Sequence, residues 1–312
     1  MELDIAHVEG AIASLNLGRV ASVTEMAGGS APAFRLDLDT GISLVLKVYM
    51  DKKARAPSGD AFASAQVQGI GVPVTRYLLA DDSKNSLPFR FAITNYLPGV
   101  LASTLAGHPD IASLYRQIGA LLRSLHSISM PAFGWFDAAG IRDPAKKNAT
   151  FVRRQFDHAF AKFTAHGADA GLAARLRQIA NNGFDAVVPH SGGAVFAHDD
   201  LHPNNVLAVD NDGMLSLSGL IDFGNAYAAA PVSDLAKCLF CSEHEAPGST
   251  RHILDGYGPI DHPDPDRALG FYTLLHRIVM WWWLRHIGVI PAPDAPSDIM
   301  DDLRRLADQK SP

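Results

Sequence analysis

Cysteine, long apolar runs and excess positive charge are all missing or scarce in this sequence of 312 residues. The only cysteines are Cys238 and Cys241, so a structural zinc site, which normally takes four ligands, has no second cysteine pair. The longest strongly apolar run, 278–284, is far too short to cross a bilayer, and the N-terminus lacks the pattern of a secretory signal. The net charge of −6 argues against a nucleic-acid-binding surface. We therefore expect a soluble, cytoplasmic protein without nucleic acid or membrane partners.

What is present is enough apolar sequence for two packed lobes, since 47% of the residues are hydrophobic. The spacing of Cys238 and Cys241 is also that of a redox pair, but no thioredoxin-like pattern accompanies it. We favour a simpler interpretation, in which both thiols pack as small apolar groups on a helix that runs from Asp234.

The most informative segment is His-Asp-Asp-Leu-His-Pro-Asn-Asn, residues 198–205, followed later by Ile-Asp-Phe-Gly, residues 221–224. Asn205 follows Asp200 by five residues, which is the spacing of the base and the metal-binding Asn in kinase catalytic loops. Asp222 comes seventeen residues after Asn205, at the end of an apolar strand. Phosphoryl transfer from ATP to a hydroxyl needs one carboxylate for the hydroxyl and oxygen ligands for hard cations, and these three side chains supply both.

The sequence between these side chains predicts a β-hairpin. An apolar strand over 206–209, a turn over 210–213 and a largely apolar run over 214–221 follow one another directly. Such a hairpin would carry Asn205 at the start of one strand and Asp222 at the end of the other.

These segments, with Pro-Val-Ser-Asp-Leu-Ala at 231–236, resemble the aminoglycoside phosphotransferase and choline kinase family, the small-molecule branch of the protein-kinase-like fold. Asp199 stands where protein kinases generally carry Arg, and no Ala-Pro-Glu follows 222–224, so a metabolite or drug kinase is favoured over a protein kinase. The resemblance implies an α+β, bilobal fold with a small antiparallel-sheet N-lobe, residues 1–97, that binds the nucleotide. A larger, mainly helical C-lobe, residues 98–312, would carry the catalytic loop and the acceptor site.

The resemblance also implies a role for each residue of the loop. Asp200 would position and deprotonate the acceptor hydroxyl, and His198 and Asp234 would hold the loop in place. Asn205 and Asp222 would bind Mg²⁺ beside ATP. A role as helix N-cap would by itself also explain Asp234.

The first hundred residues predict the nucleotide-binding half. Helical spacing over 3–15 precedes alternating strands over 34–38 and 42–49. Lys47 lies inside the second strand, where its ammonium must leave an apolar sheet or find anions. The resemblance assigns Lys47 to the α- and β-phosphates of ATP, and an exposed edge position is the plain structural alternative.

A glycine pair precedes these strands. Gly28, Gly29 and Ser30 would form the loop over the phosphates, where main-chain N–H groups can approach oxygen closely because glycine has no side chain. Two glycines in a turn are also ordinary, and Gly-x-Gly-x-x-Gly is absent.

The helical glutamate that pairs with the strand lysine in kinases has no counterpart between Lys47 and Pro73. Asp60, in a predicted helix over 56–68, is the only well-placed substitute. Its side chain is shorter by about 1.5 Å, one carbon–carbon bond, so the helix would have to sit closer to the lysine or leave it partly unpaired.

The lobes should join where strand alternation stops, at Asn95, Tyr96 and Leu97. In this fold the main chain of the connection hydrogen-bonds the adenine edge, and a plain strand-to-loop exit is the alternative. After this point we predict helices over 111–125, 150–163 and 172–179, and an ordered loop at 133–137 whose aromatic side chains pack inward.

Several functional alternatives stay open from the sequence. The acceptor could be an aminoglycoside-like antibiotic, choline, homoserine, a sugar or a macrolide, and the donor ATP or GTP. A non-catalytic pseudokinase is allowed by Asp60 in place of glutamate. A metal hydrolase built on His198 and His202 is less favoured, because Pro203 predicts a loop where a zinc-binding His pair would need a helix. The oligomeric state is not predicted.

Overall fold

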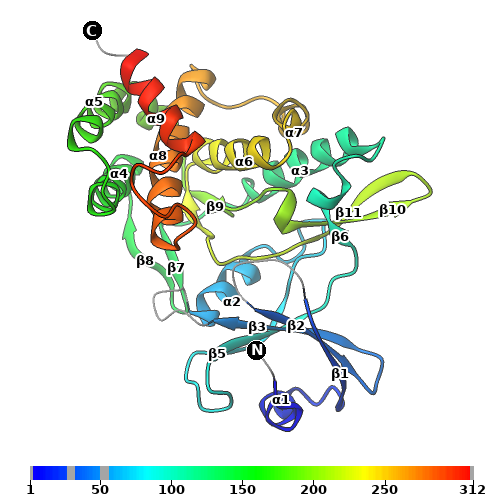
Figure 1. Ribbon diagram of the computed structural model, residues 1–312. Helices are drawn as coiled ribbons and strands as arrows, with labels where there is room; N and C mark the ends of the chain where they lie inside the picture. The colour runs from blue at the N-terminus through cyan, green and yellow to red at the C-terminus, as the bar shows by residue number, and fades with distance from the viewer. Residues whose placement is uncertain (1–2, 27–31, 50–55, 310–312) are drawn as a thin grey trace.

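The computed structural model describes residues 3–26, 32–49 and 56–309, and shows a smaller and a larger lobe (Figure 1). The smaller lobe holds a five-stranded antiparallel sheet in the order β1-β2-β3-β5-β4. This arrangement confirms the predicted α+β, bilobal fold. The elements of the smaller lobe are α1 (Ile5–Ile12), β1 (Val20–Glu25), β2 (Ala33–Leu38), β3 (Ser43–Tyr49), α2 (Pro57–Gln66), β4 (Tyr77–Asp81) and β5 (Arg90–Asn95).

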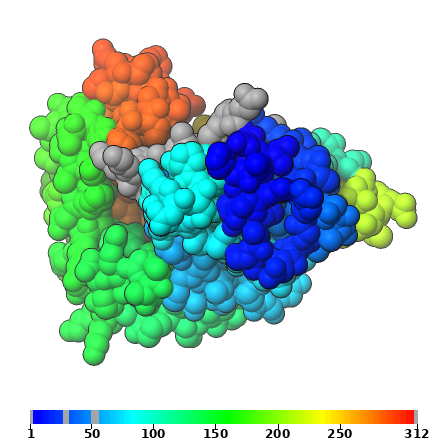
Figure 2. All heavy atoms as spheres, turned by 90° about the horizontal axis from the view of Figure 1, so that it is seen from below, coloured from blue at the N-terminus to red at the C-terminus, as the bar shows by residue number. Residues whose placement is uncertain are grey.

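The larger lobe is mainly helical and carries two small sheets, β11-β10-β6 and β8-β7-β12-β9. Figure 2, seen from the side of the smaller lobe, shows the helical lobe extending beyond it on several sides. No helix in the described ranges has the length and apolarity that membrane crossing demands. Its strands are β6 (Val100–Leu101), β7 (Phe133–Asp137), β8 (Gly140–Ala145), β9 (Val195–Ala197), β10 (Val206–Asn211), β11 (Met214–Leu220) and β12 (Tyr227–Ala229). Its helices are α3 (Ile111–Leu125), α4 (Asn148–Ala165), α5 (Ala170–Val187), α6 (Pro231–Glu245), α7 (Ser249–Tyr257), α8 (Pro265–His286) and α9 (Asp298–Gln309).

In the sheet of the smaller lobe, alternate side chains of each strand lie on opposite faces. In β3 the apolar residues Leu44, Leu46 and Val48 are fully buried on the face that packs with α1 and the neighbouring strands. Because successive side chains of a strand point to opposite faces, Lys47 is turned to the other face. That face looks toward the larger lobe, so the alternation of the strand places the ammonium at the junction of the lobes.

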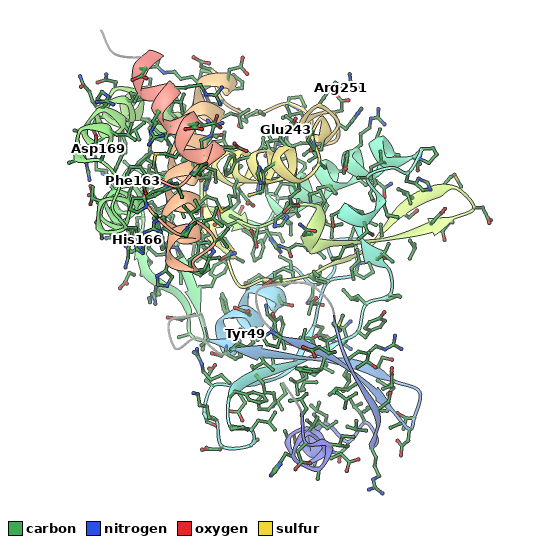
Figure 3. All side chains as sticks on the ribbon, viewed as in Figure 1. Tyr49, Phe163, His166, Asp169, Glu243 and Arg251 are labelled. Carbon is green, nitrogen blue, oxygen red and sulfur yellow. The ribbon has the colours of Figure 1, made fainter. Side chains whose placement is uncertain are left out.

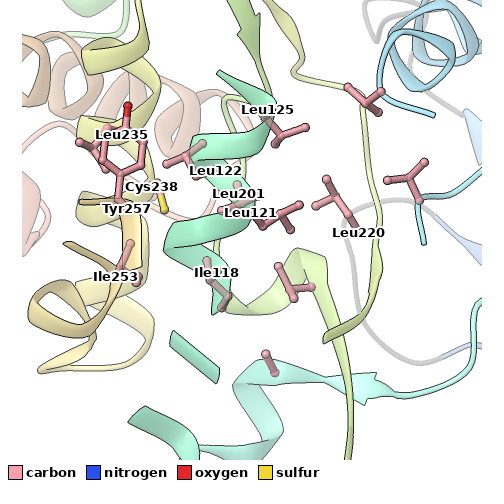
Figure 4. Close-up of a cluster of buried hydrophobic side chains, with 14 of the residues drawn as sticks. Ile118, Leu121, Leu122, Leu125, Leu201, Leu220, Leu235, Cys238, Ile253 and Tyr257 are labelled. Carbon is pink, nitrogen blue, oxygen red and sulfur yellow. The ribbon is translucent and has the colours of Figure 1, made fainter. Parts of the chain in front are cut away.

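One hydrophobic cluster of the larger lobe surrounds α3 and includes part of the catalytic segment (Figure 4), and a second lies among α4, α5, α8 and α9. Leu201, in the middle of the predicted catalytic loop, is fully buried among α3 and α6 side chains, and Leu220 at the end of β11 is buried beside them. Burying a leucine contributes about 1.5 to 3 kcal/mol. The loop is therefore anchored in the hydrophobic core at its centre.

The predicted hairpin is confirmed as β10 and β11, paired from Val206 opposite Leu220 to Asn211 opposite Met214. The predicted turn over 210–213 is too long, because Asp210 and Asn211 still pair with β11. Its two-residue turn consists of Asp212 and Gly213, both with positive φ (55° and 87°). Positive φ at both central positions is typical of a type I′ turn, which follows the twist of the strands.

The prediction of a loop at 133–137 is wrong, because this segment is strand β7, paired with β8 and β12. Only a three-residue stretch of β12 provides its partner on one side, and such nonlocal pairing leaves no local signal. Phe133 and Phe136 are buried, so the predicted inward packing of its aromatic side chains is confirmed.

Helices α3 and α7 approach closely through two glycines. A Cβ at Gly256 would lie 1.9 Å from the carbonyl oxygen of Arg116, and one at Gly119 would lie 2.0 Å from that of Ile253. We expect Gly256→Ala to lower the free energy of unfolding by about 1 to 3 kcal/mol, because the helices must separate. Urea denaturation measures this change.

Gly270 of α8 is the matched control, since a Cβ there meets nothing within 4 Å. Gly270→Ala should raise stability by about 0.5 to 1 kcal/mol through helix propensity. Equal effects of the two substitutions would contradict the close approach.

Candidate active site

A cavity of about 290 Å³ lies between the lobes. It brings together Lys47 from β3, Asn205 and Asp222 from the two ends of the β10–β11 hairpin, and the connection over 95–97. Residues that the sequence analysis did not single out complete its wall. These are Met26, Ala33, Val45, Thr75, Tyr77, Thr94, Gly99, Leu101, Asn204, Leu207 and Ile221.

Lys47 is held by acidic side chains from both lobes. Its Nζ lies 2.8 Å from Oδ1 of Asp222 and 3.7 Å from Oδ2 of Asp60. Burial opposes the ammonium charge, but the two carboxylates raise the pKa of Lys47 above its ordinary value. The same contact with Lys47 outweighs burial at Asp222 and lowers the pKa of its carboxyl. Both groups are therefore charged at neutral pH.

Asp60 lies on α2 where the sequence analysis placed it. Its carboxylate is buried and accepts a hydrogen bond of 2.6 Å from the hydroxyl of Tyr49, which lies at the lobe junction beside α2 (Figure 3). Lys47 thus keeps Asp60 at ion-pair distance, although Asp222 is the nearer partner. The same oxygen of Asp60, Oδ2, therefore faces both Lys47 and the hydroxyl of Tyr49.

Of the three residues predicted to bind the adenine edge at the connection between the lobes, the described part of the structure leaves one with a free main-chain donor. Asn95, Tyr96 and Leu97 all line the cavity. The main-chain N–H of Asn95 donates to Arg76, and that of Tyr96 donates to Ser43. The main-chain N–H of Leu97 has no acceptor among the hydrogen bonds of the described residues. Leu97 is therefore the candidate donor to a bound base.

The glycine pair cannot be compared with its prediction. Gly28, Gly29 and Ser30 lie outside the residues that the structure describes. Ala33, at the start of β2, is the nearest following residue in the cavity wall.

Asp234 fixes the start of the catalytic loop from inside α6. Its carboxylate accepts the main-chain N–H groups of His198 and Asp199, both at 2.8 Å, and lies 3.1 Å from Nε2 of His126. It is completely buried, yet the pKa of its carboxyl is lowered, because His126 and these N–H groups outweigh desolvation. The N-cap alternative is wrong, since Ala230 occupies that position.

His198 joins the loop to the hairpin. Its ring is fully buried, and Nε2 lies 3.2 Å from the carbonyl oxygen of Ile221, the residue before Asp222. The main chain of Ile221 in turn donates to the carbonyl of Asn205. His198 therefore supports the loop and does not line the cavity.

Asp200 is oriented by two neighbours in the loop. The side-chain amide of Asn205 donates to the main-chain carbonyl of Asp200 at 2.8 Å and to its Oδ2 at 3.1 Å. Nε2 of His202 lies 3.4 Å from the other oxygen, Oδ1. Burial would raise the pKa of this carboxyl, but the contact with His202 lowers it below its ordinary value. Asp200 is thus an ionised carboxylate with both oxygens engaged.

His202 has carboxylates on both ring nitrogens. Its Nδ1 lies 2.8 Å from Oε2 of Glu245, the last residue of α6. Burial opposes the charge, while Asp200 and Glu245 together raise the pKa of His202 to about 9. The metal-hydrolase interpretation loses its basis, because His198 and His202 contact different partners.

The donor set at the hairpin suits a hard cation. Because the Asn205 amide nitrogen faces Asp200, its carbonyl oxygen is the atom left for the cavity, where Asp222 adds a carboxylate. In the described ranges no group of three or more His, Cys, Asp or Glu side chains is arranged around a metal position. Mg²⁺ commonly takes one or two protein ligands and completes its shell with phosphates and water, so this set fits it.

Two left-handed residues shape the site. Asp199 (φ 56°) and Asp222 (φ 59°) adopt a conformation that aspartate tolerates better than most residues. Asp199 contacts the hydroxyl of Tyr227 at 3.2 Å, and burial raises the pKa of its carboxyl to about 7. The sequence analysis missed Tyr227, and only the unusual Asp-Asp pair hinted at a special backbone.

Comparison with known proteins identifies the family of this chain. The model of the phosphotransferase enzyme family matches residues 22–271. The chain belongs to this family. Its predicted relationship and enzyme class, a small-molecule kinase, are thereby confirmed at the family level. A search of curated proteins found no match.

Solved structures of related enzymes share the fold of this phosphotransferase. One is a thermostable mutant of aminoglycoside phosphotransferase APH(4)-Ia in complex with ADP and hygromycin B, with a TM-score of 0.71 and 16% identity over 97% of this chain and 99% of that one. Another is the GDP complex of aminoglycoside 2'-phosphotransferase-IIIa, with a TM-score of 0.62 and 16% identity over 99% and 98%. A choline/ethanolamine kinase family protein from Mesorhizobium loti gives 0.65 and 15% over 98% and 94%.

The cysteines of this phosphotransferase behave as the sequence analysis favoured. Cys238 and Cys241 are free thiols buried on α6. Burial raises the pKa of Cys241 to about 12, and that of Cys238 further. Such thiols are protonated and inert at neutral pH.

Proposed function

We propose that this phosphotransferase moves the γ-phosphoryl group of ATP to a hydroxyl of a small molecule. The observation that carries the proposal is the convergence at one cavity of Lys47, Asn205 and Asp222, with Asp200 hydrogen-bonded directly to Asn205. In this assignment residues 1–97 hold the nucleotide, and 98–312 hold the acceptor.

Each residue has a defined task. Lys47 contributes a fixed positive charge for the α- and β-phosphates, and the main chain around Leu97 meets the base. Asp200 accepts a hydrogen bond from the acceptor hydroxyl and takes its proton as the bond to phosphorus forms. The lowered pKa of Asp200 keeps it ionised, so it can both orient the hydroxyl and accept its proton.

Asn205 and Asp222 would hold Mg²⁺. When bound, the cation neutralises charge on the transferring phosphates. The chain's own part is to present one amide oxygen and one carboxylate from the two ends of a rigid hairpin, so that both ligands keep their spacing.

For the acceptor we propose an aminoglycoside-like antibiotic, which would make the enzyme a resistance factor in the cytoplasm. The fold relative described with hygromycin B and ADP supports this class, whereas the choline/ethanolamine kinase relative supports an amino alcohol. The donor is proposed to be ATP, with GTP as the alternative suggested by the GDP complex of another relative.

A coupled assay of ADP release tests the function. ATP and Mg²⁺ are supplied with hygromycin B, kanamycin, choline, homoserine, a hexose or a macrolide in turn. We expect one acceptor to raise ADP release at least about tenfold over hydrolysis to water, because positioning of the hydroxyl removes much of the barrier.

Chelation by EDTA should abolish this turnover, and added Mg²⁺ should restore it, since the phosphates lose their counter-charge without the cation. The matched control replaces EDTA with its Mg²⁺ complex. Nucleotide binding without transfer to any acceptor or to water would instead indicate a pseudokinase.

A further inference from the structure

Glu245 takes no direct part in the reaction described above, yet it contacts the catalytic loop. We propose that Glu245 is a positioning residue that acts through His202 to fix the carboxylate of Asp200 toward the acceptor hydroxyl. The inference rests on the proposed function, because it assigns Asp200 to the acceptor.

The first step is the orientation of the His202 ring, which the backbone restricts. Its main chain is extended (φ −155°, ψ 171°) and leads into Pro203, which disfavours a helical conformation for the residue before it. With the backbone set in this way, one ring nitrogen faces Glu245 at 2.8 Å and the other faces Asp200 at 3.4 Å. The ring is 12% exposed, so water competes little for either contact.

The second step concerns the carboxylate itself. The χ2 torsion of aspartate is broad, so an isolated Asp200 would sample many orientations. The side-chain amide of Asn205 donates to the main-chain carbonyl and to Oδ2 of Asp200, and its nitrogen also lies 3.2 Å from Nε2 of His202. The Nε2–H of His202 is then the group that faces Oδ1. Two donors, one on each oxygen, define the plane of the carboxylate.

The third step is the clamp formed by α6. Asp234 in its first turn holds the beginning of the loop, and Glu245 at its end holds His202. Eleven residues separate the two, about 16 Å along a helix axis. The catalytic loop is therefore held by α6 at two points, Asp234 and Glu245.

Glu245 has no local reason to be acidic. A carboxylate at the C-terminal end of a helix opposes the helix dipole, so the position favours a basic or neutral residue. The charged and titratable groups around the imidazole of His202 are Asp200 from the loop, Glu245 from α6 and the ring of His198. The contact of Glu245 with the imidazole of His202, and through it with Asp200, explains why this position is acidic.

The experiment is a double-mutant cycle on turnover. Glu245→Gln, His202→Ala and the double variant are assayed with ATP, Mg²⁺ and the best acceptor of the panel, or with water if none raises the rate. We expect Glu245→Gln to lower kcat about tenfold, within the loss that misplacement of a catalytic group causes. The KM of the acceptor and the Kd of ADP should change less than twofold.

The control variant is Glu243→Gln, the same change two residues earlier on α6. Glu243 (Figure 3) is exposed, and its carboxylate accepts the main-chain N–H groups of Gly248 and Thr250 and makes no contact with the catalytic loop among the hydrogen bonds of the described residues. It should keep the wild-type kcat. Melting temperatures of all variants check that each is folded.

The test compares the effect of Glu245→Gln on kcat in the wild-type and His202→Ala backgrounds. If Glu245 acts only through His202, Glu245→Gln should change kcat less than twofold in the His202→Ala background. An unchanged kcat in the wild-type background, or an equal loss in both backgrounds, overturns the inference while the kinase assignment stands. A wild-type protein that never releases ADP overturns both.

Discussion

Asp200→Asn is expected to lower kcat about a thousandfold, in the range that loss of a general base causes. Asparagine keeps the size of the side chain and an oxygen that can accept a hydrogen bond from the acceptor. It cannot take the proton, and it places an amide opposite the donors Asn205 and His202. Initial rates of ADP release with saturating ATP and acceptor measure the effect.

The matched control is Asp212→Asn in the hairpin turn, which is exposed and in the left-handed conformation that asparagine also tolerates. It should retain wild-type turnover. The Kd of ADP should remain within twofold in Asp200→Asn, because Asp200 does not line the nucleotide cavity. Near-normal transfer by Asp200→Asn would refute its role as the base.

Asp222→Asn is expected to lower turnover strongly by a different route. The change removes the carboxylate proposed for Mg²⁺ and the nearest ion-pair partner of Lys47 at 2.8 Å. Charge stabilisation by the metal is worth several kcal/mol, so a loss of about 10² to 10⁴ in kcat is expected. Asp222→Asn should also change the binding of nucleotide, whereas Asp200→Asn should not.

Calorimetric titration with ADP separates the two variants. Wild type should bind ADP more tightly with Mg²⁺ than without it, and Asp222→Asn should show little difference between the two conditions. Asp200→Asn and Asp212→Asn should keep the Mg²⁺ effect. If Mg²⁺ still strengthened ADP binding to Asp222→Asn, the cation would have to lie elsewhere.

The hairpin that carries Asn205 and Asp222 was predictable from sequence because its signals are local. Apolar strands on both sides of Asp-Gly fix the turn, and the turn fixes which residues stand at the two ends. Lys47 was predictable for the same reason, since a lysine inside an alternating strand must face away from the buried side.

Contacts between distant segments were not predictable. Tyr49 shares the carboxylate of Asp60, and Glu245 lies against His202, 43 residues away in sequence. Nothing in the local pattern of either residue reports such pairing. The strand β7 was misassigned as a loop for the same physical reason on one side, because its partner β12 is distant in the sequence.

One chain of contacts ties the catalytic loop to the interior. The hydroxyl of Tyr257 on α7 lies 2.8 Å from His126, which contacts Asp234, and Asp234 holds the main chain of His198. All four side chains are buried. On heating, we therefore expect the loop to stay ordered while these helices persist, so that loss of activity and melting of the larger lobe occur at the same temperature.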